Sequence, residues 1–301
     1  MLTFPQRLAE LHPILMDGAT GTELERRGLD TGTPIWSAMA LLEAPQMVEA
    51  VHRDYLDAGA EIILTNTFRT HQRSLDKLGM GEEASRLTSL AVAIAQKAVR
   101  TSGRQAWVAG SMGPLEDSYT PFDQAYEDFL REHQAMANNL AAAGVDLLLV
   151  ETMNTIKEAQ AAAEAAASTG LPFGVSFVCN ANGELLSGEP LAEAVAAVEP
   201  FGPSFLSINC TAAPSLHLAL DVLRAATELP IGVYANPGHT EDYEHWGKTE
   251  ATEPPGYAIY AADWLAHGAR LVGGCCGTRP EHIAELRKLI RPEEDLTHGI
   301  A

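Results

Sequence analysis

The strongest constraint on this sequence is a repeated alternation of short apolar runs and helical segments. Eight runs of four to six residues each end close to Gly, Asn, Thr or Ser, and several are apolar on both faces, as strands buried on both sides are. The eight predicted strands are Ile14–Asp17, Glu61–Thr65, Ala106–Gly110, Val145–Val150, Phe173–Val178, Phe205–Asn209, Ile231–Ala235 and Arg270–Gly273.

The segments between these runs are rich in helix formers. They include Phe129–Gly144, Thr155–Ser168, Leu191–Val198 and Pro214–Leu229. A Gly-centred triplet directly precedes three of the runs, at Ala58–Ala60, Ala143–Val145 and His267–Ala269, which is typical of short helix-to-strand connections. Eight such units predict a closed (β/α)8 TIM barrel. An open doubly wound sheet is the alternative, but no GxGxxG turn follows the first run.

No linker or change in composition divides the 301 residues, so we expect one domain over residues 1–301 with a short polar tail from about residue 291. The formal net charge is −20, which argues against nucleic-acid binding and against docking to anionic lipid. Neither a signal peptide nor a membrane-spanning run is apparent, so we expect a cytoplasmic protein with small-molecule partners. The sequence leaves the oligomeric state open.

Cysteines follow two of the predicted strands. Cys210 follows the sixth run, and Cys275 and Cys276 follow the eighth, behind the pair Gly273–Gly274. The carboxyl ends of barrel strands lie on one rim, where the active sites of such barrels are found. Three thiolates and one open position are a ligand set for catalytic Zn²⁺, with the two glycines expected to bend the chain. Cys179, after the fifth strand, could instead complete a closed four-sulfur site.

Several motifs at the strand ends occur in one order along the chain. These are DGATGTEL after the first strand, TNTF after the second, ET after the fourth, INC after the sixth and GGCCGT after the eighth. The set resembles the homocysteine S-methyltransferase family, over about residues 15–289. In that family the three cysteines hold zinc, which implies that Cys210, Cys275 and Cys276 are the ligands.

The resemblance also implies which residues bind the acceptor. They are Asp17, Gly18, Thr20, Glu151 and, more weakly, Thr65, all expected at the amino-acid end of homocysteine. Asn236 matches a residue that can occupy the zinc position in methionine-synthase-like members. Each has an ordinary structural alternative: Asp17 could cap the next helix, Glu151 could form an ion pair, and the others could serve a turn, a helix start or a strand.

The chemistry of this ligand set can be stated independently. Zinc deprotonates a bound thiol, and three Cys thiolates leave the site with a charge of −1, so an acceptor thiolate keeps much of its nucleophilicity. No general base is then needed, and we name no catalytic residue beyond the zinc ligands. The prediction is a zinc-dependent methyltransferase that converts homocysteine to methionine.

The methyl donor is the open part of this prediction. The segment NGELLSGEPLAEAV resembles the branch that uses S-methylmethionine, whereas GSMGPLEDSYTP departs from it. S-methylmethionine or S-adenosylmethionine comes first, betaine second, and a corrinoid or folate on another chain third. Aromatic residues that could meet a cationic donor or simply pack a loop are Tyr243, Trp246, Tyr257 and Tyr260.

Two further hypotheses belong to other classes. One is a non-catalytic, zinc-stabilised barrel that binds a thiol metabolite or a partner protein. The other is a metal-free enzyme that uses Cys210 as its nucleophile.

Overall fold

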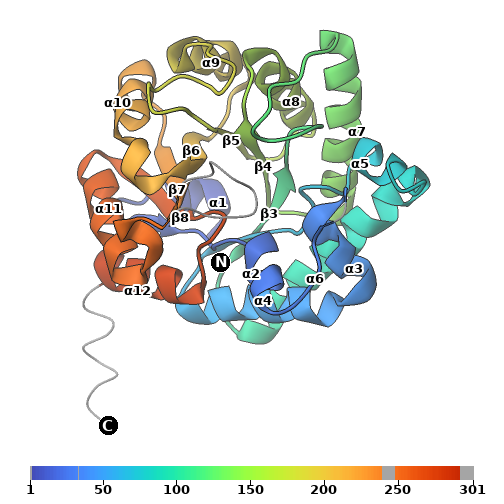
Figure 1. Cartoon of the computed structure of the whole chain (residues 1–301), viewed down its shortest axis with the longest axis horizontal. Helices are drawn as coiled ribbons and strands as arrows, with labels where there is room; N and C mark the ends of the chain where they lie inside the picture. The colour runs from blue at the N-terminus through green and yellow to red at the C-terminus, as the bar shows by residue number, and fades with distance from the viewer. Residues whose placement is uncertain (1, 33, 239–247, 292–301) are drawn as a thin grey trace.

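The computed structural model describes residues 2–32, 34–238 and 248–291. Eight parallel strands form a nearly closed barrel surrounded by helices (Figure 1). Neighbouring strands follow the order β1-β8-β7-β6-β5-β4-β3-β2, and the seam between β1 and β2 is bridged at Met16 and Ile62. The predicted (β/α)8 barrel is therefore confirmed. The strands are β1 Ile14–Leu15, β2 Ile62–Leu64, β3 Trp107–Met112, β4 Leu147–Met153, β5 Phe173–Phe177, β6 Phe205–Ala212, β7 Ile231–Asn236 and β8 Ala269–Gly274.

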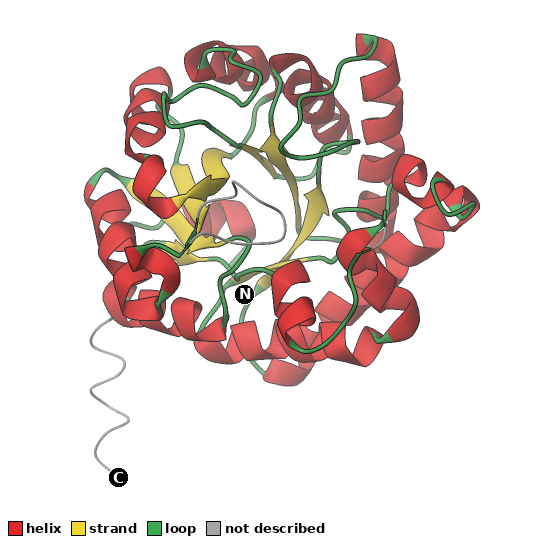
Figure 2. Ribbon diagram, viewed as in Figure 1, coloured by secondary structure: helices red, strands yellow, loops and turns green. Residues whose placement is uncertain are grey.

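The α-helices form the outer layer (Figure 2). They are α1 Phe4–Leu8, α2 Gly21–Arg26, α3 Ala40–Glu43, α4 Pro45–Ala58, α5 Gln72–Asp76, α6 Ala84–Ser102, α7 Tyr126–Ala143, α8 Ile156–Ser168, α9 Leu191–Val198, α10 His217–Ala226, α11 Pro254–Ala266 and α12 Pro280–Ile290. Among the described helices, none is both long and apolar enough to cross a membrane. Residues 292–301 of the predicted tail lie outside the described residues, as do Tyr243 and Trp246.

Two of the four predicted helices, α8 and α9, agree closely with the structure, whereas α7 begins three residues earlier than predicted and α10 is three residues shorter at each end. Helix α9 occupies the predicted residues, and Thr155 caps α8 by accepting a hydrogen bond from the Glu158 N–H. Gly59, Gly144 and Gly268, the glycines of the three triplets, all have positive φ, as helix-ending glycines do. Several strands, in contrast, extend beyond their predicted ends: β3, β4 and β6 continue by two or three residues.

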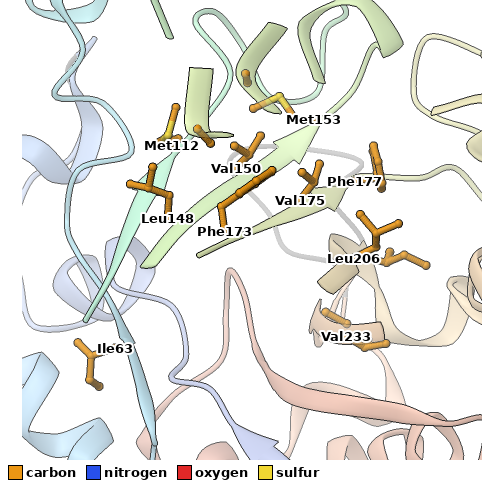
Figure 3. Close-up of a cluster of buried hydrophobic side chains, with 14 of the residues drawn as sticks. Ile63, Met112, Leu148, Val150, Met153, Phe173, Val175, Phe177, Leu206 and Val233 are labelled. Carbon is orange, nitrogen blue, oxygen red and sulfur yellow. The ribbon is translucent and has the colours of Figure 1, made fainter. Parts of the chain in front are cut away.

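Two apolar layers hold the barrel together. Along β4, Leu147 and Leu149 point into the barrel, whereas Leu148 and Val150 point outward against the helices. Every strand contributes to the outward layer, and Figure 3 shows members of it from β2 to β7. Alternate residues of a strand face opposite sides, so a strand buried on both faces reads as an unbroken apolar run.

Helix α1 closes the amino-terminal end of the barrel. Phe4 packs edge-on against Trp107 and Phe205, the first residues of β3 and β6, with ring centroids about 6 Å apart. Arg7 in the same helix is paired with Glu61 at 2.9 Å. Among the described residues, the interior of the barrel is therefore closed at this end, and the pocket that Cys210 lines lies at the carboxyl ends of the strands.

A buried histidine in the outer layer generates a prediction about acid stability. His52 in α4 is fully buried, neither of its ring nitrogens has a hydrogen-bond partner, and burial lowers its pKa to about 4. Between pH 6.5 and pH 4 the unfolded chain binds a proton at His52 that the native protein does not, so stability falls as the pH falls through this window.

We expect this histidine to account for about 3 kcal/mol of the loss in unfolding free energy between pH 7 and pH 4. Urea unfolding of the wild type and of His52→Leu at both pH values measures it. The variant should lose that much less stability on acidification, and an identical pH dependence of the two proteins would contradict the assignment.

Candidate metal and substrate site

Three cysteine sulfurs converge at the carboxyl end of the barrel. The Sγ atoms of Cys210 and Cys275 are 2.7 Å apart, and Cys276 completes a group whose sulfurs all lie within 4.8 Å of one another. All three are free thiols, since a disulfide would need a sulfur separation near 2.0 Å. The predicted convergence of Cys210, Cys275 and Cys276 is therefore present, and the three form a cluster that could hold a metal ion.

Cys210 reaches the cluster through an irregularity in β6. The ladder with β7 pairs Asn209 with Tyr234 and then Ala212 with Asn236, so β6 carries one extra residue. Even-numbered residues of β6 such as Leu206 and Ile208 point outward, and a regular strand would send Cys210 the same way. The positive φ of Cys210, 52°, turns its side chain toward the pocket instead.

A similar bulge, with one extra residue and a positive φ, occurs in β4, two strands away. Val150 pairs with Val175 and Met153 pairs with Phe177, so β4 also carries an extra residue. Thr152, within this bulge, has a φ of 62°. These two bulges place Glu151, Thr152 and Cys210 on the wall of one pocket.

Cys275 and Cys276 reach the cluster because β8 ends at Gly274 and the chain then turns. The Thr278 N–H donates to the carbonyl of Cys275 at 3.0 Å, and Gly277 supplies the positive φ. Gly273 and Gly274 were expected to supply the bend, but they lie within β8 and serve close packing. An added Cβ at Gly273 would lie 2.7 Å from the Met16 Cβ, and one at Gly274 would lie 2.4 Å from the Thr278 Oγ1.

Cys179 does not join the cluster. Its side chain is buried among the apolar residues of the outer layer, and burial alone raises its thiol pKa to about 12. The alternative of a closed site with four sulfurs is therefore wrong, and one side of the cluster faces the pocket.

The electrostatics of the cluster favour a cation. Hydrogen bonds from the Cys275 and Cys276 thiols hold the pKa of Cys210 well below its ordinary value. The pKa values of Cys275 and Cys276 are raised, since each thiol donates to the Cys210 sulfur and lies beside its charge. Without a positive partner the cluster therefore accommodates one thiolate readily and resists further ionisation.

The sulfurs line a cavity of about 460 Å³. Most of the predicted site residues lie on its wall: Asp17, Gly18, Thr20, Thr65, Glu151, Cys210, Cys275 and Cys276. Asn236 lies behind this wall, where its Nδ2 donates to the Cys210 carbonyl at 2.9 Å and its buried Oδ1 has no partner. One pocket thus combines the cluster with all but one of the predicted acceptor-binding residues.

Two carboxyl groups on the wall are held by specific donors. Ser111 and Tyr234 both donate to Glu151, whose pKa is raised to about 8 by burial and by the neighbouring Cys275 sulfur. Asp17 accepts from the Leu64 N–H at 2.8 Å, and burial raises its pKa well above its ordinary value. Neither carboxyl pairs with Lys or Arg in the hydrogen bonds and ion pairs found among the described residues, so the ion-pair alternative for Glu151 finds no support there.

The remaining predicted residues have local roles as well as a place on the wall. Thr20 is the N-cap residue of α2 but its side chain makes no capping hydrogen bond. Thr65 accepts from the Ser111 N–H at 3.1 Å and lies 2.7 Å from the Thr67 hydroxyl. Gly18 has no room for a side chain, since a Cβ would lie 2.8 Å from Tyr55 and from Thr278.

The aromatic residues of the pocket were not predicted. Trp36, Phe68, Tyr119 and Tyr234 line it, whereas Tyr257 is buried beneath the rim, donating to the Ala235 and Gly273 carbonyls. Tyr119 belongs to the segment GSMGPLEDSYTP, which departs from the branch that uses S-methylmethionine. The Tyr119 hydroxyl lies 3.4 Å from the Asn236 Nδ2. Trp36 carries no comparable sequence signal.

A second group of potential metal ligands lies on the surface between α10 and α11, outside the pocket. It comprises His217, Asp263 and His267, with nitrogen–oxygen separations of 3.4–3.6 Å. His217 and Asp263 are exposed and His267 is half-buried, and the three can form ordinary surface ion pairs. The buried cysteine cluster is therefore the candidate metal centre.

Comparisons with known proteins agree with this geometry. The family model described as homocysteine S-methyltransferase matches residues 14–290. The homocysteine S-methyltransferases of Bacillus subtilis and Escherichia coli are 32% and 34% identical to this chain, over 93% and 91% of it and 96% and 94% of their own lengths. A crystal structure of the E. coli homocysteine methyltransferase MmuM, in its metallated form, aligns with a TM-score of 0.82 at 31% identity, covering 95% of this chain and 99% of that one. This chain belongs to the homocysteine S-methyltransferase family.

Proposed function

We propose that this protein transfers a methyl group from a small cationic donor to the thiol of L-homocysteine, giving methionine. The observation that carries the proposal is the cluster of three sulfurs on the wall of the cavity that also contains Glu151. Family membership supports the reaction class, and the side chains of the pocket support the specific roles proposed below.

The residues of the cluster fit a bound Zn²⁺. Three soft sulfur ligands favour zinc over harder cations, and a cation would relieve the resistance of Cys275 and Cys276 to ionisation. Asn236 Oδ1 is buried without a hydrogen-bond partner, and the Nδ2 of the same amide donates to the Cys210 carbonyl, so we assign this oxygen as a ligand that would bind zinc in the absence of the acceptor. When bound, zinc would supply Lewis acidity that keeps an acceptor thiol in its nucleophilic thiolate form.

We assign the amino-acid end of homocysteine to the carboxyl groups and the first-strand loop. Glu151 is oriented by Ser111 and Tyr234 and would face the substrate ammonium group. Asp17, Gly18, Thr20 and Thr65 lie on the same wall. Holding both ends of the acceptor fixes the direction in which its sulfur can attack.

The outer part of the pocket suits a cationic donor. Trp36 is in edge-to-face contact with Phe68 there, and Glu25 accepts from the Trp36 indole N–H at 3.1 Å. The Arg69 guanidinium already lies over the Phe68 ring, 5.0 Å from its centroid, so we assign the donor to the ring of Trp36. Aromatic faces next to carboxylates attract sulfonium or quaternary ammonium groups. S-methylmethionine or S-adenosylmethionine is therefore the first choice and betaine the second.

The transfer itself balances without a general base on the protein. The acceptor thiol releases its proton to solvent on binding, before the transfer. Its sulfur then attacks the methyl carbon of a sulfonium donor, the carbon–sulfur bond of the donor breaks, and the bonding pair leaves with a neutral thioether.

A panel of donors tests the proposal. Purified, zinc-loaded protein is incubated with L-homocysteine and S-methylmethionine, S-adenosylmethionine or betaine, and methionine formation is measured. Turnover with a sulfonium donor is expected. Absence of turnover with every donor, including corrinoid- and folate-bound methyl groups, would favour the thiol-binding barrel instead.

Removal of individual cysteines tests the ligand set. Wild-type protein should retain about one zinc ion per chain after dialysis, whereas Cys210→Ser and Cys275→Ser should lose the metal and methionine formation together. Elemental analysis of the dialysed proteins provides the measurement.

Cys179→Ala is the matched control, because this cysteine lies outside the cluster, and it should keep its zinc. Full activity of Cys275→Ser, or of chelator-treated wild type, would instead support the metal-free enzyme with Cys210 as nucleophile.

Replacing Glu151 by an amide tests the acceptor subsite. With a pKa raised to about 8, the carboxyl would ionise fully when the substrate ammonium group binds beside it, and an amide does not ionise. Glu151→Gln should lower kcat/KM for homocysteine by about 10- to 100-fold through loss of a charge-assisted contact of about 1.5–3 kcal/mol, with KM for the donor little changed. Steady-state kinetics with each substrate varied in turn separates the two effects.

Glu158→Gln is a control at another buried carboxylate. Glu158 does not line the pocket, and its Oε1 lies 3.0 Å from the His133 Nε2. It should lower stability and leave KM for homocysteine within about twofold. Equal effects of the two substitutions on that KM would show that Glu151 has only a structural role.

A further inference from the structure

One buried amide connects the two strand bulges of the site. The Asn209 Oδ1 accepts from the Thr152 N–H at 3.0 Å and from the Ser176 hydroxyl at 2.7 Å. Its Nδ2 donates to the Thr152 Oγ1 at 2.7 Å and to the Cys210 Sγ at 3.4 Å, with the Cys275 Sγ at 3.9 Å. The Thr152 hydroxyl in turn lies 3.7 Å from the Cys210 sulfur and donates to it.

The orientation of this amide is fixed by its partners. A backbone N–H can only donate, so the Thr152 N–H requires the oxygen of Asn209 on its side. The Asn209 NH₂ group must then face Thr152 Oγ1 and the sulfurs. The side chain is fully buried, so no water competes for these hydrogen bonds.

The bulge in β4 explains why an amide is needed at this position. The register shift between Val150 and Met153 takes Thr152 out of the regular ladder, and Asn209 supplies the acceptor for its N–H. The amide group has a second, separate face toward the sulfurs. A structural role and a role toward Cys210 can therefore be separated by substitution.

We propose that Asn209 is a positioning residue for the thiolate cluster, acting directly and through the Thr152 hydroxyl. The inference rests on the proposed function. Hydrogen bonds to an ionised acceptor are roughly twice as strong as neutral ones, so these donors hold Cys210 in its inward conformation and stabilise negative charge on its sulfur. A sulfur stabilised in this way is a weaker nucleophile than the acceptor thiolate, which keeps Cys210 a ligand while the substrate is methylated.

Asn209→Asp is the decisive substitution. It keeps an oxygen for the Thr152 N–H and the Ser176 hydroxyl, but replaces the N–H donor that faces the sulfurs. We expect affinity for Zn²⁺, measured by chelator competition, to fall by about 10- to 100-fold. In the Co²⁺-loaded protein the sulfur-to-metal charge-transfer band should move to longer wavelength, because the thiolate loses its hydrogen bond. A purely structural role predicts that the zinc affinity and the Co²⁺ band of Asn209→Asp both equal those of the wild type. That result would overturn the proposal.

Thr152 provides a second test that does not depend on whether the Asn209→Asp variant folds. Thr152→Val removes the hydroxyl and keeps the branched shape and the backbone N–H, whereas Thr152→Ser keeps the hydroxyl. Zinc affinity should fall severalfold in the first and stay within about twofold in the second. Equal affinities of the two variants would overturn the relay through Thr152.

Ser176→Ala is the matched control, because it removes one hydrogen bond from the same amide on the side away from the sulfurs. It should leave the Co²⁺ band in place, and a band shift as large as that of Asn209→Asp would overturn the assignment. Failure of the proposed function is distinguishable: wild type that binds no zinc through its cysteines refutes the zinc site. Wild type that binds zinc, with Asn209→Asp identical to it, refutes only the role of Asn209.

Discussion

The site depends on a break in the alternation of two strands. In a barrel of parallel strands, every second residue faces the helices, and Thr152 and Cys210 both fall on outward positions of that pattern. Each is turned inward by one extra residue and a left-handed backbone, an arrangement that costs a non-glycine residue about 1–3 kcal/mol. The surrounding hydrogen bonds offset this cost: Asn209 satisfies the bulge in β4, and Asn236 satisfies the Cys210 carbonyl in β6.

The same geometry concentrates groups that repel one another when ionised. Glu151, Asp17 and three thiols share one wall. Desolvation and nearby negative charge raise the pKa values of Asp17 and Glu151, whereas hydrogen bonds to the Cys210 sulfur are the main cause of the raised pKa values of Cys275 and Cys276. Arg69 and Lys77 line the same pocket, but in the hydrogen bonds and ion pairs of the described residues no Lys or Arg pairs with Glu151, Asp17 or the sulfurs. A metal cation, an ammonium group and a sulfonium group are all positively charged, so one electrostatic property accounts for the three ligands of the proposed reaction.

The sequence predicts the parts of this structure that follow from local patterns. Apolar runs, helix-forming segments and glycines such as Gly144 establish the barrel, and the position of Cys210, Cys275 and Cys276 near strand ends predicts their convergence. The two bulges were missed because an extra residue leaves no mark on an apolar run, so β4 and β6 were ended too early. The role of Gly273 depends on the approach of Met16, which follows β1, and Asn209 in β6 meets Thr152 in β4 with β5 between them. Local patterns do not encode these contacts.

The closure of the barrel by α1 has a consequence for the order in which substrates bind and products are released. Because Phe4 and its neighbours close one end, both substrates of the proposed reaction would enter from the opposite end, as far as the described residues define the pocket. The acceptor would lie deepest, beside the sulfurs and Glu151, with the donor between it and solvent. This arrangement would impose an ordered mechanism. Homocysteine would bind first, and the demethylated donor would dissociate before methionine is released.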